Sequence, residues 1–460
     1  MYTCPSKKGI EGKMKTLIKD FKVCNRCRKE LNPKLLIGLP LLISILLFNT
    51  SFQSKYYVQG AINEQFEPKP VEGLPTVNDN KLKVEMVFEG LQFPTSLEFL
   101  GQDDVLLTEK NNGTVQRITN WKLQQNPVLD VNVATRAERG MLGIAIAKNN
   151  ESENINGQNN TIVFVYFTRS SEAKDTNGVR GEKSGGNVLY RYELVDSKLS
   201  NPHLLLELSP RKHPSHNGGA IIIGQDRNLY IPVGDGDGDT TEAQNIIGGG
   251  PPNGTGGILT MSQDGSSVQN IIGNSGILDK YYAYGVRNSF GLDFDPLSGK
   301  LWDTENGNKS GDEINLIEAG FNSGWRMIQG KAPPEFNYSQ LVNFDGKGRY
   351  SDPEFSWTET VGPTKIKFLN SEKLGKSYQN DMLVSDIKNG RIYHFDLNER
   401  RDSLLLSGNL TDKVADSDQE LNDLIFGSGF AGITDMDVGP DGYLYVLSFG
   451  KGAIYKISPK

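Results

Sequence analysis

Histidine is scarce in this chain, and one histidine stands where an imidazole could do acid–base chemistry. Of the four histidines, His216 lies in His-Pro-Ser-His-Asn-Gly-Gly at the entry to the apolar run 220–223. Histidine accepts a proton near neutral pH, which the oxidation of an alcohol requires of a base. His216 is therefore a candidate general base, and the alternative is a turn histidine that caps backbone groups.

A second segment places an arginine next to an amide. Arg287 and Asn288 stand in Ala-Tyr-Gly-Val-Arg-Asn-Ser-Phe-Gly, and the glycine-containing loop 302–313 follows. A guanidinium group beside an amide suits anionic or quinoid oxygens, and the backbone carbonyls of such a loop suit calcium. The alternative is a structural network in which Arg287 pairs with Asp293 or Glu305.

A third segment, Gly-Asp-Gly-Asp-Gly-Asp at 234–239, has the composition of a calcium loop. Counted from Asp235, the twelfth position is Ile246, whereas an EF-hand carries a glutamate there. Carboxylates that form turns are the preferred interpretation, and a weak calcium site is the alternative.

A repeat of paired strands must position these segments. From residue 81 onward, a short apolar strand, a turn with glycine or aspartate and an alternating strand recur, with units beginning near residues 97, 142, 221, 292, 366 and 436. This spacing is typical of propeller blades of four strands, and a β-sandwich is the alternative. Because six similar units close most simply as a ring, the sequence predicts an all-β, six-bladed β-propeller over residues 81–460, with function at one mouth of its channel.

The first 80 residues differ from the rest in composition. Residues 1–34 contain ten basic and three acidic residues, and residues 35–48 are apolar and uncharged. This order predicts a basic cytoplasmic head (1–34) and a membrane anchor or signal segment (35–52), with the propeller outside the cytoplasm. A retained anchor is preferred because no Ala-x-Ala-like cleavage site follows. Residues 53–80 have the composition of a linker.

Charge and cysteine content exclude other classes of function. Beyond residue 34 the chain has 39 basic and 53 acidic residues, a formal charge of −14, which argues against nucleic-acid binding. Cys4, Cys24 and Cys27 all precede the apolar segment, so the body has no disulfide, and the lone Cys-x-x-Cys supplies half of a zinc site. Several Asn-x-Ser/Thr triplets beyond the linker are compatible with a glycosylated, exported surface.

Three stretches together carry a family resemblance: HNGGAIIIGQDRNLYIPVGDGD, AYGVRNSFGLDFDPLSGKLWDTENGNKSGDEINLIEAGFNSGW and MDVGPDGYLYVLSFGKGAIYKI. From about Val84 to the C-terminus the chain resembles the soluble quinoprotein glucose/sorbosone dehydrogenase family. The resemblance implies a six-bladed propeller that binds pyrroloquinoline quinone and calcium at the channel mouth. It also implies oxidation of the C1 hydroxyl of an aldose to a lactone.

The resemblance assigns roles to five residues around the quinone. His216 corresponds to the general base, and Arg287 and Asn288 to the pair beside the quinone oxygens, where Arg287 stabilises the reduced cofactor. Glu138, in Glu-Arg-Gly-Met-Leu-Gly, matches a position that contacts the cofactor. Lys388, in Asp-Ile-Lys-Asn-Gly, matches a lysine that meets a cofactor carboxylate.

Three further residues are assigned by the same resemblance. Gly307 and Asn308 match the carbonyl pair that holds the calcium, where the family usually has Gly-Pro. Trp357 resembles an aromatic residue at the substrate rim.

One departure from the family pattern concerns the residues that bind the carboxylates of the cofactor. Before the last unit the family shows Arg-x-Arg-Asp, whose guanidinium groups hold the cofactor carboxylates, whereas this chain has Gly432-Ile-Thr-Asp435. Compensation by Lys388, Arg391 or Arg139 is expected if the cofactor binds.

Two hypotheses of different class follow. The first is a membrane-anchored dehydrogenase outside the cytoplasm that depends on the quinone and calcium, takes a sugar or alcohol as substrate and passes electrons to an unidentified acceptor. The second is a cell-surface propeller without cofactor that binds a glycan or protein partner. A calcium-dependent lactonase is a weaker third, because the loops do not supply its carboxylate-rich metal centre.

Overall fold

The computed structural model describes residues 68–147, 161–177, 183–268 and 270–460. The chain divides into two units, Met1–Glu64 and Gln65–Lys460, and the described residues all belong to the second. The predicted head (1–34), the predicted anchor or signal segment (35–52) and most of the predicted linker lie outside the described residues. Within the described ranges no helix is both long and apolar enough to cross a membrane.

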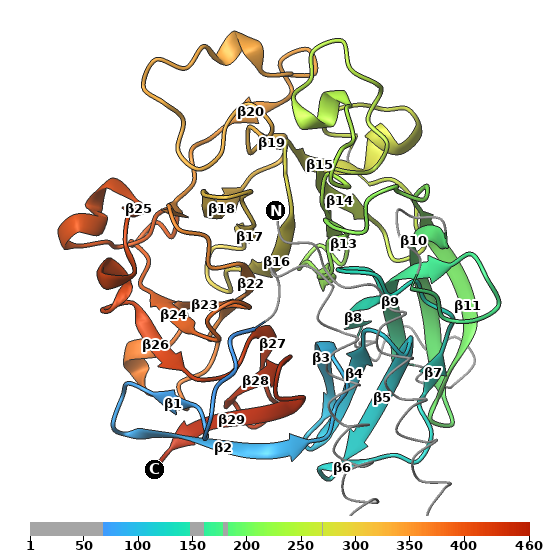
Figure 1. Ribbon diagram of the computed structural model, residues 1–460, viewed down its shortest axis with the longest axis vertical. Helices are drawn as coiled ribbons and strands as arrows, with labels where there is room; N and C mark the ends of the chain where they lie inside the picture. The colour runs from blue at the N-terminus through green and yellow to red at the C-terminus, as the bar shows by residue number, and fades with distance from the viewer. Residues whose placement is uncertain (1–67, 148–160, 178–182, 269) are drawn as a thin grey trace, which may run out of the picture. The chain divides into compact units, whose positions relative to one another are not determined.

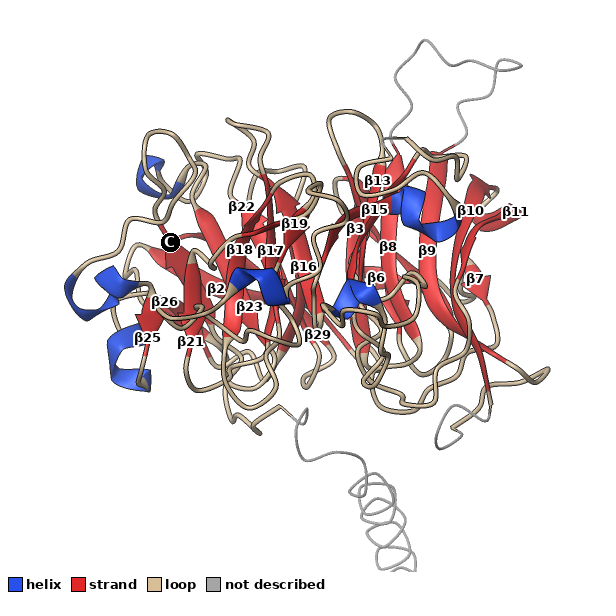
Figure 2. Cartoon of the chain, turned by 90° about the horizontal axis from the view of Figure 1, so that it is seen from above, coloured by secondary structure: helices blue, strands red, loops and turns tan. Residues whose placement is uncertain are grey.

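Strands build nearly all of the regular structure that is described, and helices are short 3-10 segments (Figure 2). The 3-10 helices are η2 (Glu242–Gln244), η3 (Gly276–Lys280), η4 (Tyr338–Gln340), η5 (Lys376–Tyr378), η6 (Gly408–Asp412) and η7 (Asp418–Leu421). The all-β class predicted from the sequence is therefore confirmed.

The described strands form six sheets, each named here by its strand nearest the central axis. The β3 sheet contains β3 (Pro94–Gly101), β4 (Asp104–Glu109), β5 (Thr114–Thr119), β6 (Lys122–Leu123) and β7 (Leu129–Asp130). The β8 sheet contains β8 (Met141–Ala147), β9 (Thr161–Ser170), β10 (Ser184–Val195) and β11 (Lys198–Glu207). The β12 sheet contains β12 (Ile222–Ile223), β13 (Leu229–Val233), β14 (Gly257–Met261), β15 (Tyr281–Tyr284), β19 (Phe321–Asn322) and β20 (Arg349–Tyr350).

The other three sheets complete the unit. The β16 sheet contains β16 (Ser289–Phe294), β17 (Leu301–Glu305), β18 (Asp312–Ile317), β21 (Phe355–Trp357) and β25 (Val414–Ala415). The β22 sheet contains β22 (Pro363–Phe368), β23 (Met382–Asp386), β24 (Ile392–Phe395), β26 (Ile425–Ser428) and β1 (Thr76–Val77). The β27 sheet contains β27 (Ile433–Val438), β28 (Leu444–Ser448), β29 (Ala453–Pro459) and β2 (Leu82–Glu89). β1 lies inside the predicted linker and pairs with β26.

The sheets are arranged as a propeller around a central axis (Figure 1). Strand β3 lies beside β8, β8 beside β12, β13 beside β16, β16 beside β22, β22 beside β27, and β27 beside β3. The innermost strands begin within about three residues of most of the unit starts expected from the sequence repeat. Hydrophobic periodicity therefore located the sheets correctly.

Hydrophobic clusters hold neighbouring sheets together. One cluster combines Leu142 and Phe164 of the β8 sheet with Ile231 and Leu259 of the β12 sheet, and each of these is at most 3% exposed. Because a sheet in a ring has a neighbour on both faces, its central strands are apolar on both faces, as in the buried run of β9.

Two glycines allow the innermost strands to approach closely. A Cβ atom at Gly143 of β8 would lie 1.9 Å from the carbonyl oxygen of Gly219. At Gly291 of β16 it would lie 2.1 Å from the carbonyl oxygen of Thr364. A side chain at either position would push two innermost strands apart, so these glycines keep the channel narrow.

The two ends of the propeller meet in the β27 sheet. The early strand β2 pairs antiparallel with β29, the last strand of the chain, with Leu82 opposite Pro459 and Val84 opposite Ile457. Leu82 is 3% exposed and belongs to the cluster that contains Met436 and Leu444. The ring is therefore closed by an apolar contact between residues far apart in the sequence.

We expect Leu82→Ala to lower the free energy of unfolding by about 2–5 kcal/mol, the usual cost of a buried leucine-to-alanine change. Met86→Ala is the matched control, because Met86 stands in the same strand but is 42% exposed, and its expected effect is within about 0.5 kcal/mol. Urea unfolding of both variants measures the difference. Equal effects of the two substitutions would contradict closure through Leu82.

Candidate functional site

The loops at one face of the propeller carry most of the residues predicted to act. In antiparallel sheets of this order, the loop before the first strand and the loop after the second strand end at the same face. Three site residues precede or begin first strands: Glu138 before β8, His216 before β12 and Asn288 before β16. Two follow second strands, Gly307 after β17 and Lys388 after β23. This face is called the mouth below.

Glu138 links three sheets at the mouth. Its Oε2 atom accepts a hydrogen bond from the backbone N–H of His216 at 2.7 Å and a longer one from Nδ2 of Asn288 at 3.4 Å. Its Oε1 atom and the Oδ1 atom of Asn288 are buried without a hydrogen-bond partner among the described residues. Buried polar atoms normally have partners, so this pair of oxygens marks a place where a ligand fits.

His216 forms a buried pair with Asp235. Nδ1 of His216 lies 2.5 Å from Oδ1 of Asp235, and the two side chains are 5% and 1% exposed. Asp235 also accepts from the indole Nε1 of Trp325 at 2.8 Å and from the backbone of Asp237 at 2.9 Å. His216 itself has a φ of 60°, a left-handed backbone conformation that costs energy outside glycine and clusters at functional sites.

The pair fixes which ring nitrogen of His216 is available. Burial raises the pKa of Asp235, but the hydrogen bonds from His216 and Trp325 outweigh burial and lower it overall. Because the carboxylate accepts from Nδ1–H, Nε2 is the nitrogen left to accept a proton. The 234–239 segment therefore supplies the partner of the histidine, a role that its turn-like composition did not indicate.

Arg287 is held in place but retains an unused donor. Its Nη1 atom donates to the carbonyls of Asn306 at 2.8 Å and Gly307 at 2.6 Å, and the guanidinium lies 5.4 Å from the centre of the Trp325 ring. The Nε atom of Arg287 is buried without a partner among the described residues. The predicted pairing of Arg287 with Glu305 occurs through the backbone N–H of Arg287, at 2.6 Å from Oε1.

The predicted calcium ligands lie at the mouth in different surroundings. The carbonyl of Gly307 accepts from Arg287, and the Gly307 N–H donates to Oδ1 of Asp312 at 2.8 Å. Asn308 is exposed. Two carbonyl oxygens, one of which already accepts a hydrogen bond, make an incomplete calcium site, since calcium takes six to eight oxygens. The arrangement therefore does not by itself fit the ion.

Lys388 and Trp357 line a neighbouring cavity of about 250 Å³. Lys388 donates from Nζ to the Thr360 carbonyl at 3.1 Å and also contacts the Thr360 hydroxyl. Trp357 is 1% exposed and packs against Phe355, with ring centres 4.8 Å apart. Trp357 is thus a buried residue that lines this cavity, and its place at a substrate rim stays a prediction of the resemblance.

Two cations suggested as compensation for the missing arginines are engaged elsewhere. Arg139 is 1% exposed and donates to the carbonyls of Arg211 and His213 at 2.7 and 3.0 Å. Arg391 forms two hydrogen bonds with Asp418. Of the three cations, Arg391 therefore has a charged partner, whereas Arg139 and Lys388 donate to neutral groups.

Lys110 is a mouth residue that sequence reasoning missed. It follows β4, which is the loop position of Lys388 in another sheet, and this equivalence is the signal that could have found it. Its side chain is 8% exposed, with Nζ bonded to Oδ1 of Asn111 at 2.9 Å. Burial lowers the pKa of Lys110 to about 8, and the nearby charge of Glu138 opposes that shift.

Behind the mouth, the β16 sheet buries several carboxyl groups. Asp303, Glu305 and Glu313 are each at most 3% exposed, and both oxygens of Asp303 lack partners among the described residues. Burial raises the pKa of Asp303 to about 7 and that of Glu313 to about 8. Asp303 and Glu313 therefore hold protons at mildly acidic pH, because burial disfavours the charged form of a carboxyl group.

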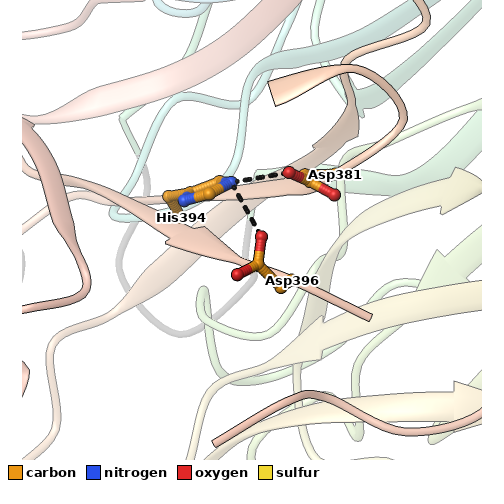
Figure 3. A group of neighbouring side chains, drawn as sticks. All are labelled: Asp381, His394 and Asp396. Carbon is orange, nitrogen blue, oxygen red and sulfur yellow. Dashed lines mark hydrogen bonds and ion pairs between the residues drawn. The ribbon is translucent and has the colours of Figure 1, made fainter. Parts of the chain in front are cut away.

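A separate cluster of side chains lies at the opposite face. His394 points its Nε2 atom at Oδ2 of Asp381, 3.0 Å away, and at Oδ1 of Asp396, 3.6 Å away (Figure 3). The three side chains could hold a metal ion, since their ligand atoms lie within 4.8 Å of one another. Asp381 precedes β23 and Asp396 follows β24, so the cluster is remote from the mouth.

The fold defines a propeller protein, and the mouth residues form a candidate ligand site at one end of its channel. The family model described as "Glucose / Sorbosone dehydrogenase" matches residues 91–456, and the chain belongs to this family. The resemblance seen in the sequence is therefore confirmed, and with it the prediction that the protein is an oxidoreductase of the sugar dehydrogenase type.

Known relatives agree with this assignment. The chain is 26% identical over 389 residues to "Aldose sugar dehydrogenase YliI" of Escherichia coli, covering 82% of this chain and 93% of that protein. The solved apo-form of the soluble aldose sugar dehydrogenase of Escherichia coli superimposes with a TM-score of 0.62 at 21% identity, covering 82% of this chain and all of that one. The PQQ-bound aldose sugar dehydrogenase of Streptomyces coelicolor gives 0.56 at 22% identity, covering 85% and 100%. At these identities the solved structures support the fold.

The buried Asp303 generates a prediction about stability and pH. Its pKa is raised in the folded protein, to about 7, above an unfolded value of about 3.9. The folded state thus binds more protons than the unfolded state between these values, so the contribution of Asp303 to stability falls as the pH rises from about 4 to about 7. Replacing Asp303 with a residue that does not titrate should therefore abolish this loss of stability with rising pH.

We expect the free energy of unfolding of Asp303→Asn, taken relative to that of wild type, to be higher at pH 8 than at pH 5. Thermal unfolding at both pH values measures this difference. Glu335→Gln, at an exposed position, is the control and should show no such change between the two pH values. A pH-independent effect of Asp303→Asn would contradict a raised pKa.

Proposed function

We propose that this protein oxidises the C1 hydroxyl of an aldose, or a related alcohol, to the lactone or carbonyl product with pyrroloquinoline quinone as cofactor. The observation that supports this most is the buried His216–Asp235 pair at 2.5 Å next to the unpartnered atoms of Glu138 and Asn288. The pair supplies a base at the mouth of a dehydrogenase propeller, and the two oxygens are acceptors for donor groups of a ligand, such as the hydroxyls of a sugar.

The residues present fit the quinone. Pyrroloquinoline quinone is a flat tricarboxylate with carbonyl oxygens, and it calls for cations and hydrogen-bond donors. Arg287 offers a buried Nε–H that has no partner within the part of the chain that the structure describes, and Lys110 and Lys388 add positive charge at the same face. When bound, the quinone supplies the acceptor for the hydride that leaves the sugar carbon.

The chain's own residues handle the proton. Oxidation of an alcohol releases a proton as well as a hydride, and Nε2 of His216 accepts that proton. Asp235 stabilises the imidazolium that forms, in the way a buried carboxylate supports a catalytic histidine. Glu138 fixes the backbone of His216 and the side chain of Asn288, which keeps the base and the amide in register.

Several finer properties belong to the same proposal. We count each of the six sheets as one blade, which makes the propeller six-bladed. Residues 1–34 form a cytoplasmic head, residues 35–52 anchor the chain in the cell membrane, and the propeller acts outside the cytoplasm on a sugar or alcohol, passing electrons to an unidentified acceptor. Calcium dependence through Gly307 and Asn308 is kept as a prediction of the resemblance, and no chemical step is derived through the ion.

The alternative is a cell-surface propeller that binds a glycan or protein partner without cofactor. Two observations favour it: Gly432 and Thr434 stand where the family has arginines, and the Gly307 carbonyl already accepts from Arg287. Cofactor binding distinguishes the two functions.

Calorimetric titration of pyrroloquinoline quinone into the full chain, with calcium present, tests the proposed function. We expect binding by the wild type and binding at least about tenfold weaker for Arg287→Ala, because a charge-assisted contact contributes about 1.5–3 kcal/mol. Arg349→Ala, at an exposed position of β20, is the control and should bind as the wild type does. Absence of binding at high micromolar cofactor would exclude the dehydrogenase and leave the binding propeller.

The His216–Asp235 pair makes a kinetic prediction. With the quinone bound and an artificial dye as electron acceptor, His216→Ala should lower kcat for aldose oxidation by about 10²–10⁴-fold, the usual contribution of a general base. Asp235→Asn should lower kcat in the same direction, because the asparagine no longer stabilises the imidazolium. Steady-state assays over a panel of aldoses measure both, and wild-type kcat in either variant would rule out the proton-transfer role.

A further inference from the structure

A narrow cavity lies on the propeller axis just inside the mouth. Its volume is about 10 Å³, and each of the six sheets or the loop leading to it contributes a lining residue: Thr95, Leu142, Ala220, Phe290, Lys365 and Thr434. His216 precedes Ala220 by four residues and Asn288 precedes Phe290 by two. The cavity therefore lies toward the end of the channel that carries His216 and Asn288, and Asp435 also lines it.

Lys365 is the cationic residue in the lining of this cavity. It belongs to β22, and its Nζ lies 2.9 Å from Oδ1 of Asp435, with the side chain 17% exposed. Asp435 is held in turn, because its Oδ2 accepts from the Ser96 hydroxyl at 2.8 Å and from the Leu97 N–H at 2.9 Å. The ammonium group is thus fixed at a defined place on the channel wall.

The ammonium group keeps hydrogen-bonding capacity. An ammonium has three N–H groups, and Asp435 is the hydrogen-bond acceptor that the described residues provide for Lys365. Burial disfavours the charge, but the nearby carboxylate of Asp435 outweighs burial and raises the pKa of Lys365 overall. Lys365 therefore remains protonated at neutral pH with donors left for a ligand.

The neighbouring lysine on the same strand is not equivalent. Lys367 lies 3.0 Å from Oδ1 of Asp437 and 3.7 Å from Oδ2 of Asp293, so two carboxylates surround it. It also stands two residues further from the mouth along β22 and is absent from the cavity lining. Lys365 is the lysine of β22 placed to meet a ligand at the mouth.

The location of Lys365 bears on the arginines that the family pattern has at positions 432 and 434 and that this chain lacks. Thr434 stands at one of the positions where the family has an arginine, and it lines the same cavity as Lys365. Its hydroxyl is engaged with the Pro94 carbonyl at 2.9 Å. A positive charge missing from β27 is thus present on the adjacent strand β22.

We propose that Lys365 binds a carboxylate of the cofactor from the channel side, in place of the guanidinium missing at position 434. This inference rests on the proposed function, since it presumes that the quinone binds at the mouth. Its chemistry is a charge-assisted hydrogen bond between an ammonium and a carboxylate.

The test is the affinity of the full chain for pyrroloquinoline quinone, measured by calorimetry without any turnover. Lys365→Met should weaken binding by about 10- to 100-fold, which corresponds to one charge-assisted contact. Lys451→Met is the matched control, because Lys451 follows β28 at the same face but donates to the carbonyls of Val71 and Gly73. Its affinity should stay within about threefold of wild type.

A rescue experiment separates ligand binding from folding. In Lys365→Met, Asp435 loses its charged partner, so a double variant Lys365→Met/Asp435→Asn keeps the channel free of an unpaired carboxylate. This double variant should fold and still bind weakly. Adding Thr434→Arg to Lys365→Met returns a cation to the cavity and should recover at least about tenfold in affinity.

The outcomes distinguish this inference from the proposed function. If wild type binds, Arg287→Ala weakens binding and Lys365→Met does not, then Lys365 has no role and the dehydrogenase remains. If folded Lys365→Met binds weakly and Thr434→Arg fails to recover affinity, replacement of the missing guanidinium is overturned. If wild type does not bind the quinone at all, both ideas fail together.

Discussion

Closure of the ring is the constraint on which the rest of this structure depends. The pairing of β2 with β29 joins the two ends of the propeller, and Leu82 buries its side chain among residues of the last sheet. Once the ring is closed, six innermost strands must converge on one axis, and the glycines at positions 143 and 291 let them approach. Loops from separate parts of the chain then end at a common mouth. One carboxylate oxygen of Glu138 accepts hydrogen bonds from both His216 and Asn288, although Asn288 is 150 residues away in the sequence.

Convergence of the loops brings charged groups together where solvent access is low, and their desolvation costs free energy. Partner groups at the mouth offset this cost. Asp235 is compensated by His216 and Trp325, and Asp435 by Lys365 and backbone donors. Other polar atoms have no hydrogen-bond partner in the described ranges of the chain, including one oxygen of Glu138 and the Nε of Arg287. Unsatisfied buried atoms are costly in a protein that has no ligand for them, so their grouping around a paired histidine is the structural argument for a cofactor site.

The sequence predicted the strand repeat and the histidine, because both depend on local pattern. Apolar alternation located the innermost strands, and the rare His216 between proline and glycines stood out by composition. The partners of these residues could not be predicted in the same way. Asp235 is one of three similar aspartates in a glycine-rich turn, and only the closed ring shows that it faces His216. Trp357 was expected at a substrate rim, and its low exposure of 1% was not predictable from the sequence. Lys365 was missed because Lys365 and Lys367 share one face of the strand, and the sequence does not show which carboxylates surround each of them.

The central claim is that the mouth of this propeller holds pyrroloquinoline quinone against the His216–Asp235 pair. The most direct test is an experimental structure of the full chain after addition of the quinone. The account predicts the cofactor at the mouth, within hydrogen-bond distance of Arg287 and with a carboxylate near Lys365. A structure that shows the mouth without cofactor at saturating quinone, or the quinone bound away from His216, would contradict it.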